Sequence, residues 1–192
     1  MCTDGDDVTN LTQTAFLSSV SRLQTLSPTI GDLWSEVLLA CRGWKGRAVH
    51  RFNGPWTGNT SHPILFIGNA ADPVCPVSAA HKMAKRFEGS VVLTVDGPGH
   101  TASAVPSLCW VKHLRAYLHD GVLPEEGTVC QAEVVPFGPG VEQLAAERVA
   151  GEEEAKMLRA LDEVALGVRV GRRYLGGIDI RNKLHIYMNY IT

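Results

Sequence analysis

Residues 63–100 contain two short apolar runs with a helix-like segment between them, and this pattern constrains the fold more than any other feature of the chain. The runs cover residues 64–67 and 91–95, and the segment between them covers residues 78–87. Two strands joined by one helical crossover pair in parallel, so their C-terminal ends lie at the same edge of a sheet. The sequence therefore predicts an α/β fold with a parallel sheet.

An aspartate and a histidine follow these two strands. Asp72 comes just after the first run, and His100 ends the sequence Gly-Pro-Gly-His after the second. Open α/β sheets bind their ligands at this edge. An acid that orients a histidine, and a histidine that accepts a proton, are two members of a hydrolytic triad. Asp-Pro is also ordinary turn chemistry, so the spacing alone leaves a structural role for Asp72 open.

The sequence shows no obvious nucleophile. A strand-to-helix elbow of the form G-x-S-x-G would supply a serine, and in this type of hydrolase it precedes the acid and the base. That pentapeptide is absent from residues 1–192. Cys75 is an alternative nucleophile close to Asp72, but it lies on the loop of the acid rather than on an elbow. Ser103 follows His100 and fits a helix cap better.

A series of short segments over about two thirds of the chain matches a known pattern in order. The segments are 2–5, 34–35, 51–56, 62–69, 71–74, 90–94, 98–100, 106–109, 121–124 and 127–130, together with Cys41 and Trp44. With these motifs, residues 1–137 resemble the C-terminal region of the tripeptidyl-aminopeptidase-like (TAP-like) α/β-hydrolases, which include many secreted microbial and fungal enzymes.

The resemblance implies a partial α/β-hydrolase fold, namely the last two parallel strands with flanking helices, a helical N-terminal segment and a C-terminal helix. It implies that Asp72 is the triad acid and His100 the general base, and the nucleophilic serine of the family has no counterpart. It also implies a small peptide or ester substrate and no cofactor or metal. We expect the nucleophile-bearing part of the enzyme, with any export signal, to lie outside these residues.

The five cysteines allow two interpretations. The resemblance implies disulfides between Cys2 and Cys41 and between Cys109 and Cys130, which leaves Cys75 free. The alternative is buried, reduced thiols, as in a cytosolic protein. Connectivity does not follow from sequence alone.

Composition excludes several classes of partner. The formal net charge is −2, which gives no electrostatic reason to bind nucleic acid or an anionic membrane surface. No apolar run is long enough to span a bilayer, and residues 1–30 show no signal-peptide pattern, so the compartment stays undetermined. The remaining histidines lack metal-ligand spacing; they are His50, His62, His81, His113, His119 and His185.

We divide the chain into a TAP-like region, 1–137, and a terminal region, 138–192. Within the first, residues 1–60 form a lead-in and residues 61–130 the catalytic part. Three helices are predicted in this region. The first covers residues 10–26, the second begins at Asp32 as its N-cap and stops at Gly43, and the third covers residues 106–121. The last of these carries an inward side made of Leu108, Val111, Leu114 and Leu118.

The terminal region is expected to contain one amphipathic helix from Val141 to Val168. A helix that lies on its own domain is favoured over one that binds a partner. Residues 169–192 carry no motif and suit a disordered tail or a translated intron.

Two functions remain. The first is the C-terminal portion of a serine hydrolase, inactive alone. The second is a truncated, non-enzymatic binding or regulatory module that pairs with another hydrolase chain.

Overall fold

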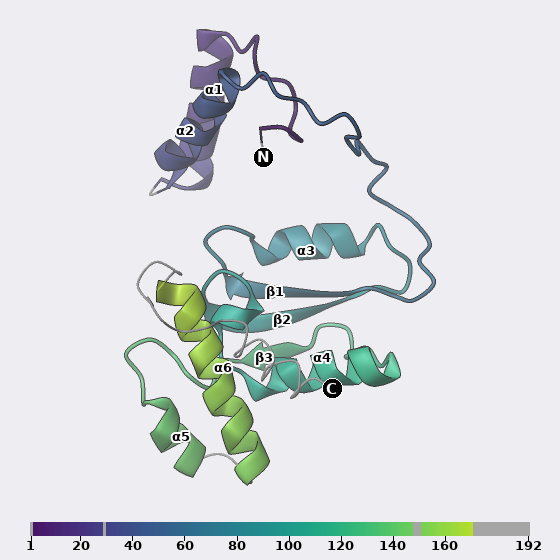
Figure 1. Ribbon diagram of the computed structural model, residues 1–192, viewed down its shortest axis with the longest axis vertical. Helices are drawn as coiled ribbons and strands as arrows, with labels where there is room; N and C mark the ends of the chain where they lie inside the picture. The colour runs from purple at the N-terminus through teal and green to yellow at the C-terminus, as the bar shows by residue number, and fades with distance from the viewer. Residues whose placement is uncertain (1, 29, 148–150, 171–192) are drawn as a thin grey trace. The chain divides into compact units, whose positions relative to one another are not determined.

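The computed structural model describes residues 2–28, 30–147 and 151–170. The chain forms two compact units, Met1–Gly54 and Pro55–Thr192 (Figure 1). The second unit contains a parallel β-sheet with helices packed against it, so the predicted α/β class is confirmed. The proposed boundary near residue 137 stays a prediction. The predictions for the tail, residues 169–192, lie outside the described residues from residue 171 onward.

The first unit contains two helices, α1 (Gln13–Leu26) and α2 (Gly31–Arg42). Thr12 caps α1, because its side chain accepts a hydrogen bond from a backbone N–H of the first turn. The two helices come close together at Gly31. A Cβ at this position would lie 2.6 Å from backbone atoms of Leu23, so only glycine permits this approach.

The prediction that Asp32 caps α2 is wrong. Ile30 occupies the N-cap position and makes no side-chain capping bond. Asp32 lies in the first turn, where its negative charge is favourable next to the helix N-terminus. Its carboxylate accepts a hydrogen bond of 2.7 Å from Gln24 Nε2 and so connects the two helices.

Covalent and polar contacts hold the N-terminal segment of this unit. Cys2 and Cys41 form a disulfide with a Cα–Cα distance of 5.1 Å. The guanidinium groups of Arg47 and Arg51 donate hydrogen bonds of 2.6–3.3 Å to this segment. The acceptors are the carbonyls of Cys2, Asp4 and Gly5 and the carboxylate of Asp6.

The sheet of the second unit contains β1 (Leu65–Ala71), β2 (Val91–Pro98) and β3 (Val129–Gln131), in that order and all parallel. Helix α3 (Val77–Ala84) connects β1 to β2, which confirms the predicted strand–helix–strand unit. The register between β1 and β2 is regular up to Asn69 and shifts beyond it. The short strand β3, which was not predicted, extends the sheet beside β2.

The remaining helices follow β2 in the chain. A single turn of 3-10 helix, η1 (Ala102–Ala104), precedes α4 (Leu108–Asp120), and α5 (Val141–Glu147) and α6 (Glu152–Val170) come last. Helix α4 ends at Gly121, whose φ of 67° is the left-handed conformation that glycine adopts at helix C-termini.

The prediction of one helix over residues 141–168 is wrong. Arg159 on α6 pairs with Glu142 on α5 at 3.0 Å. In one continuous helix, residues 17 apart in the sequence would lie about 25 Å apart along the axis. Helix α6 therefore folds back against α5 (Figure 1).

Helices cover both faces of the sheet (Figure 1). Helix α3 lies on one face, where the absence of a side chain at Gly68 leaves room for Val77. On the opposite face, Leu93 and Val95 of β2 are fully buried and begin the core. The core is completed by Val105, Leu108, Trp110, Val111, Cys130, Val134, Leu144, Met157, Leu158 and Leu161. The apolar side of α6 is thus part of this core, as expected for a helix that lies on its own domain.

Both disulfides that the resemblance implied are present. Cys109 of α4 joins Cys130 of β3 with a Cα–Cα distance of 5.4 Å, and Cys75 is free and exposed.

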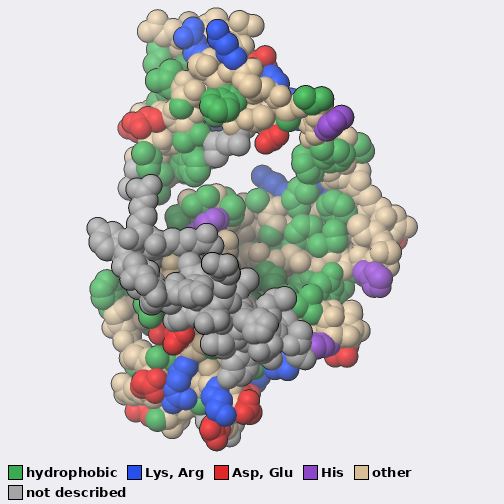
Figure 2. All heavy atoms as spheres, viewed as in Figure 1, with side chains coloured by type: hydrophobic (Ala, Val, Ile, Leu, Met, Phe, Trp, Pro, Cys, Tyr) green, Lys and Arg blue, Asp and Glu red, His purple; other side chains and the backbone are tan. Residues whose placement is uncertain are grey.

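Acidic and basic side chains intermingle over α5 and the N-terminal end of α6 (Figure 2). Within the described part of the chain, no helix has the length and apolar character needed to cross a bilayer.

Candidate active site

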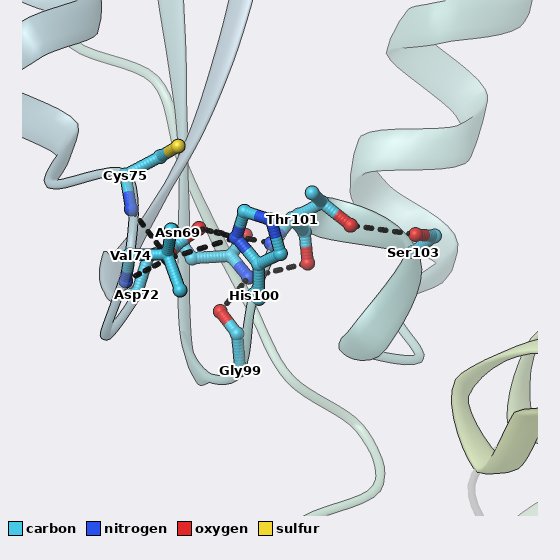
Figure 3. Close-up of polar contacts among 8 residues, drawn as sticks. All are labelled: Asn69, Asp72, Val74, Cys75, Gly99, His100, Thr101 and Ser103. Atoms are coloured by element: carbon cyan, nitrogen blue, oxygen red, sulfur yellow. Dashed lines mark hydrogen bonds and ion pairs between the residues drawn. The ribbon is translucent and has the colours of Figure 1, made fainter. Parts of the chain in front are cut away.

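The loop after β1 holds the carboxylate of Asp72 with backbone hydrogen bonds. Asp72 Oδ1 accepts hydrogen bonds of 2.8 Å from the backbone N–H groups of Val74 and Cys75 (Figure 3). Oδ2 accepts one of 2.9 Å from the N–H of Thr101, on the loop after β2. This side chain is only 3% exposed. The acid is therefore fixed by backbone donors from both loops.

His100 lies beside this carboxylate. Its Nδ1 is 3.1 Å from Asp72 Oδ1 and 3.2 Å from Oδ2 (Figure 3). Because an ionised carboxylate only accepts hydrogen bonds, Nδ1 is the donor and carries the proton of the neutral imidazole. The other nitrogen, Nε2, then has a free lone pair, and the side chain is 45% exposed. The structure thus brings the two predicted residues together at the C-terminal ends of β1 and β2.

The surroundings of Asp72 keep it ionised. Burial is the largest single influence and by itself raises the pKa of Asp72. The hydrogen bonds from the backbone of Cys75, Thr101 and Val74 and from the His100 ring outweigh it, and the pKa falls from 3.8 to about 2. The carboxylate is therefore negatively charged throughout the pH range in which a histidine acts as a base.

The histidine loop has an unusual backbone on both sides of His100. Gly99 has a φ of 141°, and a Cβ there would lie 2.8 Å from Ala104 Cβ. Thr101 has a φ of 71° and a ψ of 157°, a region that residues other than glycine rarely adopt. Such strain persists only where surrounding contacts hold it in place.

The residue that provides some of these contacts was not singled out from the sequence. Asn69, fully buried on β1, donates from Nδ2 to the carbonyls of Gly99 at 2.9 Å and Thr101 at 2.6 Å. The available signal was a polar side chain at the end of an apolar strand, directly before the acid's loop. That signal does not reveal which loop the side chain contacts.

The two other candidate nucleophiles make different contacts. Cys75 binds the acid through its backbone N–H, and its sulfur takes part in none of the contacts drawn in Figure 3. Ser103 lies inside η1, and its hydroxyl is 2.7 Å from the hydroxyl of Thr101. The expectation that Ser103 caps a helix is therefore wrong.

One group among the described residues has the mutual distances of a metal site. The Cys109 and Cys130 sulfurs and a ring nitrogen of His113 lie within 4.8 Å of one another. Both sulfurs are joined in the disulfide, which leaves the imidazole as the one available ligand. The proximity follows from the bridge that the resemblance implied, because Cys109 and His113 lie one turn apart on α4.

A parallel sheet whose successive strands are followed by an acid and a histidine in hydrogen-bond contact is typical of the α/β-hydrolase class, and this chain has a partial form of that fold. The family model described as TAP-like protein matches residues 27–130. This is more than half of the chain, and the chain belongs to the TAP-like family of α/β-hydrolases. No curated protein and no solved structure matches it.

Proposed function

We propose that the chain supplies the acid and the general base of a serine hydrolase that cleaves amide or ester bonds through an acyl-enzyme. The observation that carries the proposal is the contact of His100 Nδ1 with the Asp72 carboxylate. Family membership supports the reaction class. The TAP-like resemblance favours small peptides with a free amino terminus, or small esters, as substrates.

In this proposal, Nε2 of His100 removes the proton from the attacking hydroxyl. Asp72 holds the imidazole in the tautomer that leaves Nε2 free, and its negative charge stabilises the imidazolium that forms. The imidazolium then returns the proton to the leaving group. The backbone donors around Asp72 keep it ionised, so it orients the ring without taking the proton itself.

The nucleophile is the missing member. Residues 1–192 contain no G-x-S-x-G elbow, and we propose that a serine elbow outside them completes the triad. The isolated chain is then inactive. It should not turn over an aminoacyl-nitroanilide, and a fluorophosphonate probe should not label it.

The test is complementation. The chain is co-expressed with the elbow-bearing N-terminal portion of a TAP-like hydrolase, and the mixture is assayed with an aminoacyl-nitroanilide and a nitrophenyl ester. Activity should appear and fall by about 10³-fold or more in His100→Ala, whereas His62→Ala, an exposed histidine away from the site, should keep it. Turnover by the purified chain alone, lost in His100→Ala, would overturn the missing-nucleophile proposal.

A second candidate function follows from the edge of the sheet. Among the described residues β1 pairs only with β2, so its other side offers unpaired backbone groups. A non-enzymatic module that pairs with another hydrolase chain would use this edge. Mapping the 5′ end of the transcript separates the two candidates, since a continuous reading frame that encodes an elbow favours the enzyme. Co-purification of a separately encoded hydrolase chain favours the module.

A further inference from the structure

We propose that Asn69 is a positioning residue for His100, whose side-chain amide holds the histidine loop so that the imidazole meets Asp72. This inference rests on the proposed role of His100 as general base. It concerns a residue that touches neither the acid nor the imidazole ring in the contacts above, and that acts through the backbone of the loop.

Asn69 binds the two carbonyls that flank His100. Nδ2 has two N–H groups, and they go to the carbonyls of Gly99 and Thr101, the two residues on either side of His100 (Figure 3). A single rigid amide therefore spans the loop. Because Asn69 is fully buried on a strand of the sheet, it provides a fixed reference point for this loop.

The backbone of the histidine loop is strained at Thr101. Thr101 is β-branched and occupies a region of φ and ψ that is almost confined to glycine. Its N–H donates to Asp72 and its carbonyl accepts from Asn69. Gly99 is held in the same two ways, since its N–H donates to the Ala71 carbonyl at 3.2 Å. Without the amide, both carbonyls lose the contact that opposes relaxation of the loop.

Only the donor side of the Asn69 amide is used. Its Oδ1 is buried and has no hydrogen-bond partner in the described part of the chain. A buried acceptor without a partner is unfavourable, so an apolar side chain of the same size would suit the strand better. The presence of an amide at position 69 is therefore explained by its two N–H groups, which hold the carbonyls of Gly99 and Thr101. A substitution of Asn69 by an apolar residue can therefore separate the stability of the fold from the positioning of His100.

The experiment uses the full chain labelled with ¹⁵N, at about pH 9, where an ordinary histidine is neutral. Long-range ¹H–¹⁵N NMR correlations report the tautomer of His100, and the signals are assigned by their loss in His100→Gln. The wild-type protein should show the Nδ1-protonated tautomer. Asn69→Leu should show a mixture of both tautomers, with the low-field Nδ1 proton broadened or lost. Slow amide exchange at Leu93 and Val95 of β2 shows that the variant is folded.

A second variant and a control make the result decisive. Asn69→Asp keeps the size of the side chain and removes both N–H donors, so it should also give a mixture of the two His100 tautomers. It replaces the leucine variant in the test if that variant loses amide protection at β2. Ser107→Ala is the control. Ser107 is equally buried, but among the described residues its side chain makes no bond to the histidine loop. This variant should keep the wild-type tautomer.

Failure of the inference differs from failure of the proposed function. A folded Asn69→Leu or Asn69→Asp protein that keeps the pure Nδ1-protonated tautomer overturns the positioning role. Asp72→Ala, which removes both side-chain acceptors, tests the dyad in the same measurement. If it leaves the tautomer unchanged, His100 is not oriented by Asp72, and the proposed function fails independently of Asn69.

Discussion

The two units of this chain are stabilised in different ways. In the described part of the first unit, Gly31 and Ser35 are the only buried residues, and large apolar side chains such as Leu17 and Leu33 are more than half exposed. The second unit has a continuous core in which Leu93, Val95 and Leu158 are fully buried. A small unit that buries little apolar surface depends on cross-links, whereas a larger one can rely on its core.

This difference bears on the candidate site. Asp72 and His100 follow two strands that belong to the unit with the core, and backbone donors hold the acid in place. A catalytic pair requires a rigid scaffold, because small displacements of reacting groups slow a reaction strongly. The sheet provides that scaffold, and the comparison can be tested one unit at a time.

The largest expected effect is the loss of the first unit when its disulfide is removed. The bridge closes a loop with a sequence separation of 39, which corresponds to about 4 kcal/mol in the chain-entropy account. In a Cys2→Ser, Cys41→Ser protein, amides of α1 and α2 should exchange freely while β2 stays protected. Hydrogen exchange with mass spectrometry measures both, and Cys75→Ser is the control. Undiminished protection of α1 and α2 would mean that packing alone holds this unit.

A smaller effect is expected when the core of the second unit is reduced. Leu158 is fully buried on α6, so Leu158→Ala should lower the free energy of unfolding of this unit by about 3 kcal/mol. Leu17→Ala in the first unit, where the side chain is 53% exposed, should change stability by less than about 0.5 kcal/mol. Amide exchange at β2 and α1 measures the two. Equal losses at both positions would contradict the contrast between the units.

The smallest effect concerns the pH dependence of the second unit. The pKa of Asp72 is lowered from 3.8 to about 2 in the folded state. Its stabilising contribution, about 2 kcal/mol, is therefore complete above about pH 4 and is lost as the pH falls through about 2. Stability of the wild-type protein should fall over this window by about 2 kcal/mol more than that of Asp72→Asn. Parallel urea-unfolding curves for the two proteins between pH 2 and 5 would contradict the lowered pKa.

Local sequence patterns predicted the strands and loops around the site, because each of these elements depends on residues that are neighbours in the chain. The apolar runs located β1 and β2, although both strands extend beyond these runs, to Ala71 and Pro98, and the order of Asp72 and His100 predicted their contact. The same reasoning failed for α4, where Leu118 was expected inward and is 56% exposed, while Trp110 is buried and donates to the Val105 carbonyl at 2.9 Å. The helical period of apolar residues predicts which side of a helix faces the core. It does not predict how much of the helix length the rest of the protein packs against.

Strand β3 was missed because three residues are too few to show a strand period, and its pairing with β2 involves residues far away in the chain. The fold-back of α6 on α5 is likewise a contact between distant residues, carried by Glu142 and Arg159 at the surface and Leu144 and Leu158 in the core.

The sequence by itself determined the α/β class, the parallel pair of strands, and the acid and histidine that follow them, because these depend on residue order and on short-range periodicity. Only the tertiary structure decided how the histidine is held. The amide of Asn69, the strained Thr101 and the loop of Asp72 meet through hydrogen bonds between residues about thirty positions apart. Their geometry exists only once the sheet has aligned the ends of its two strands.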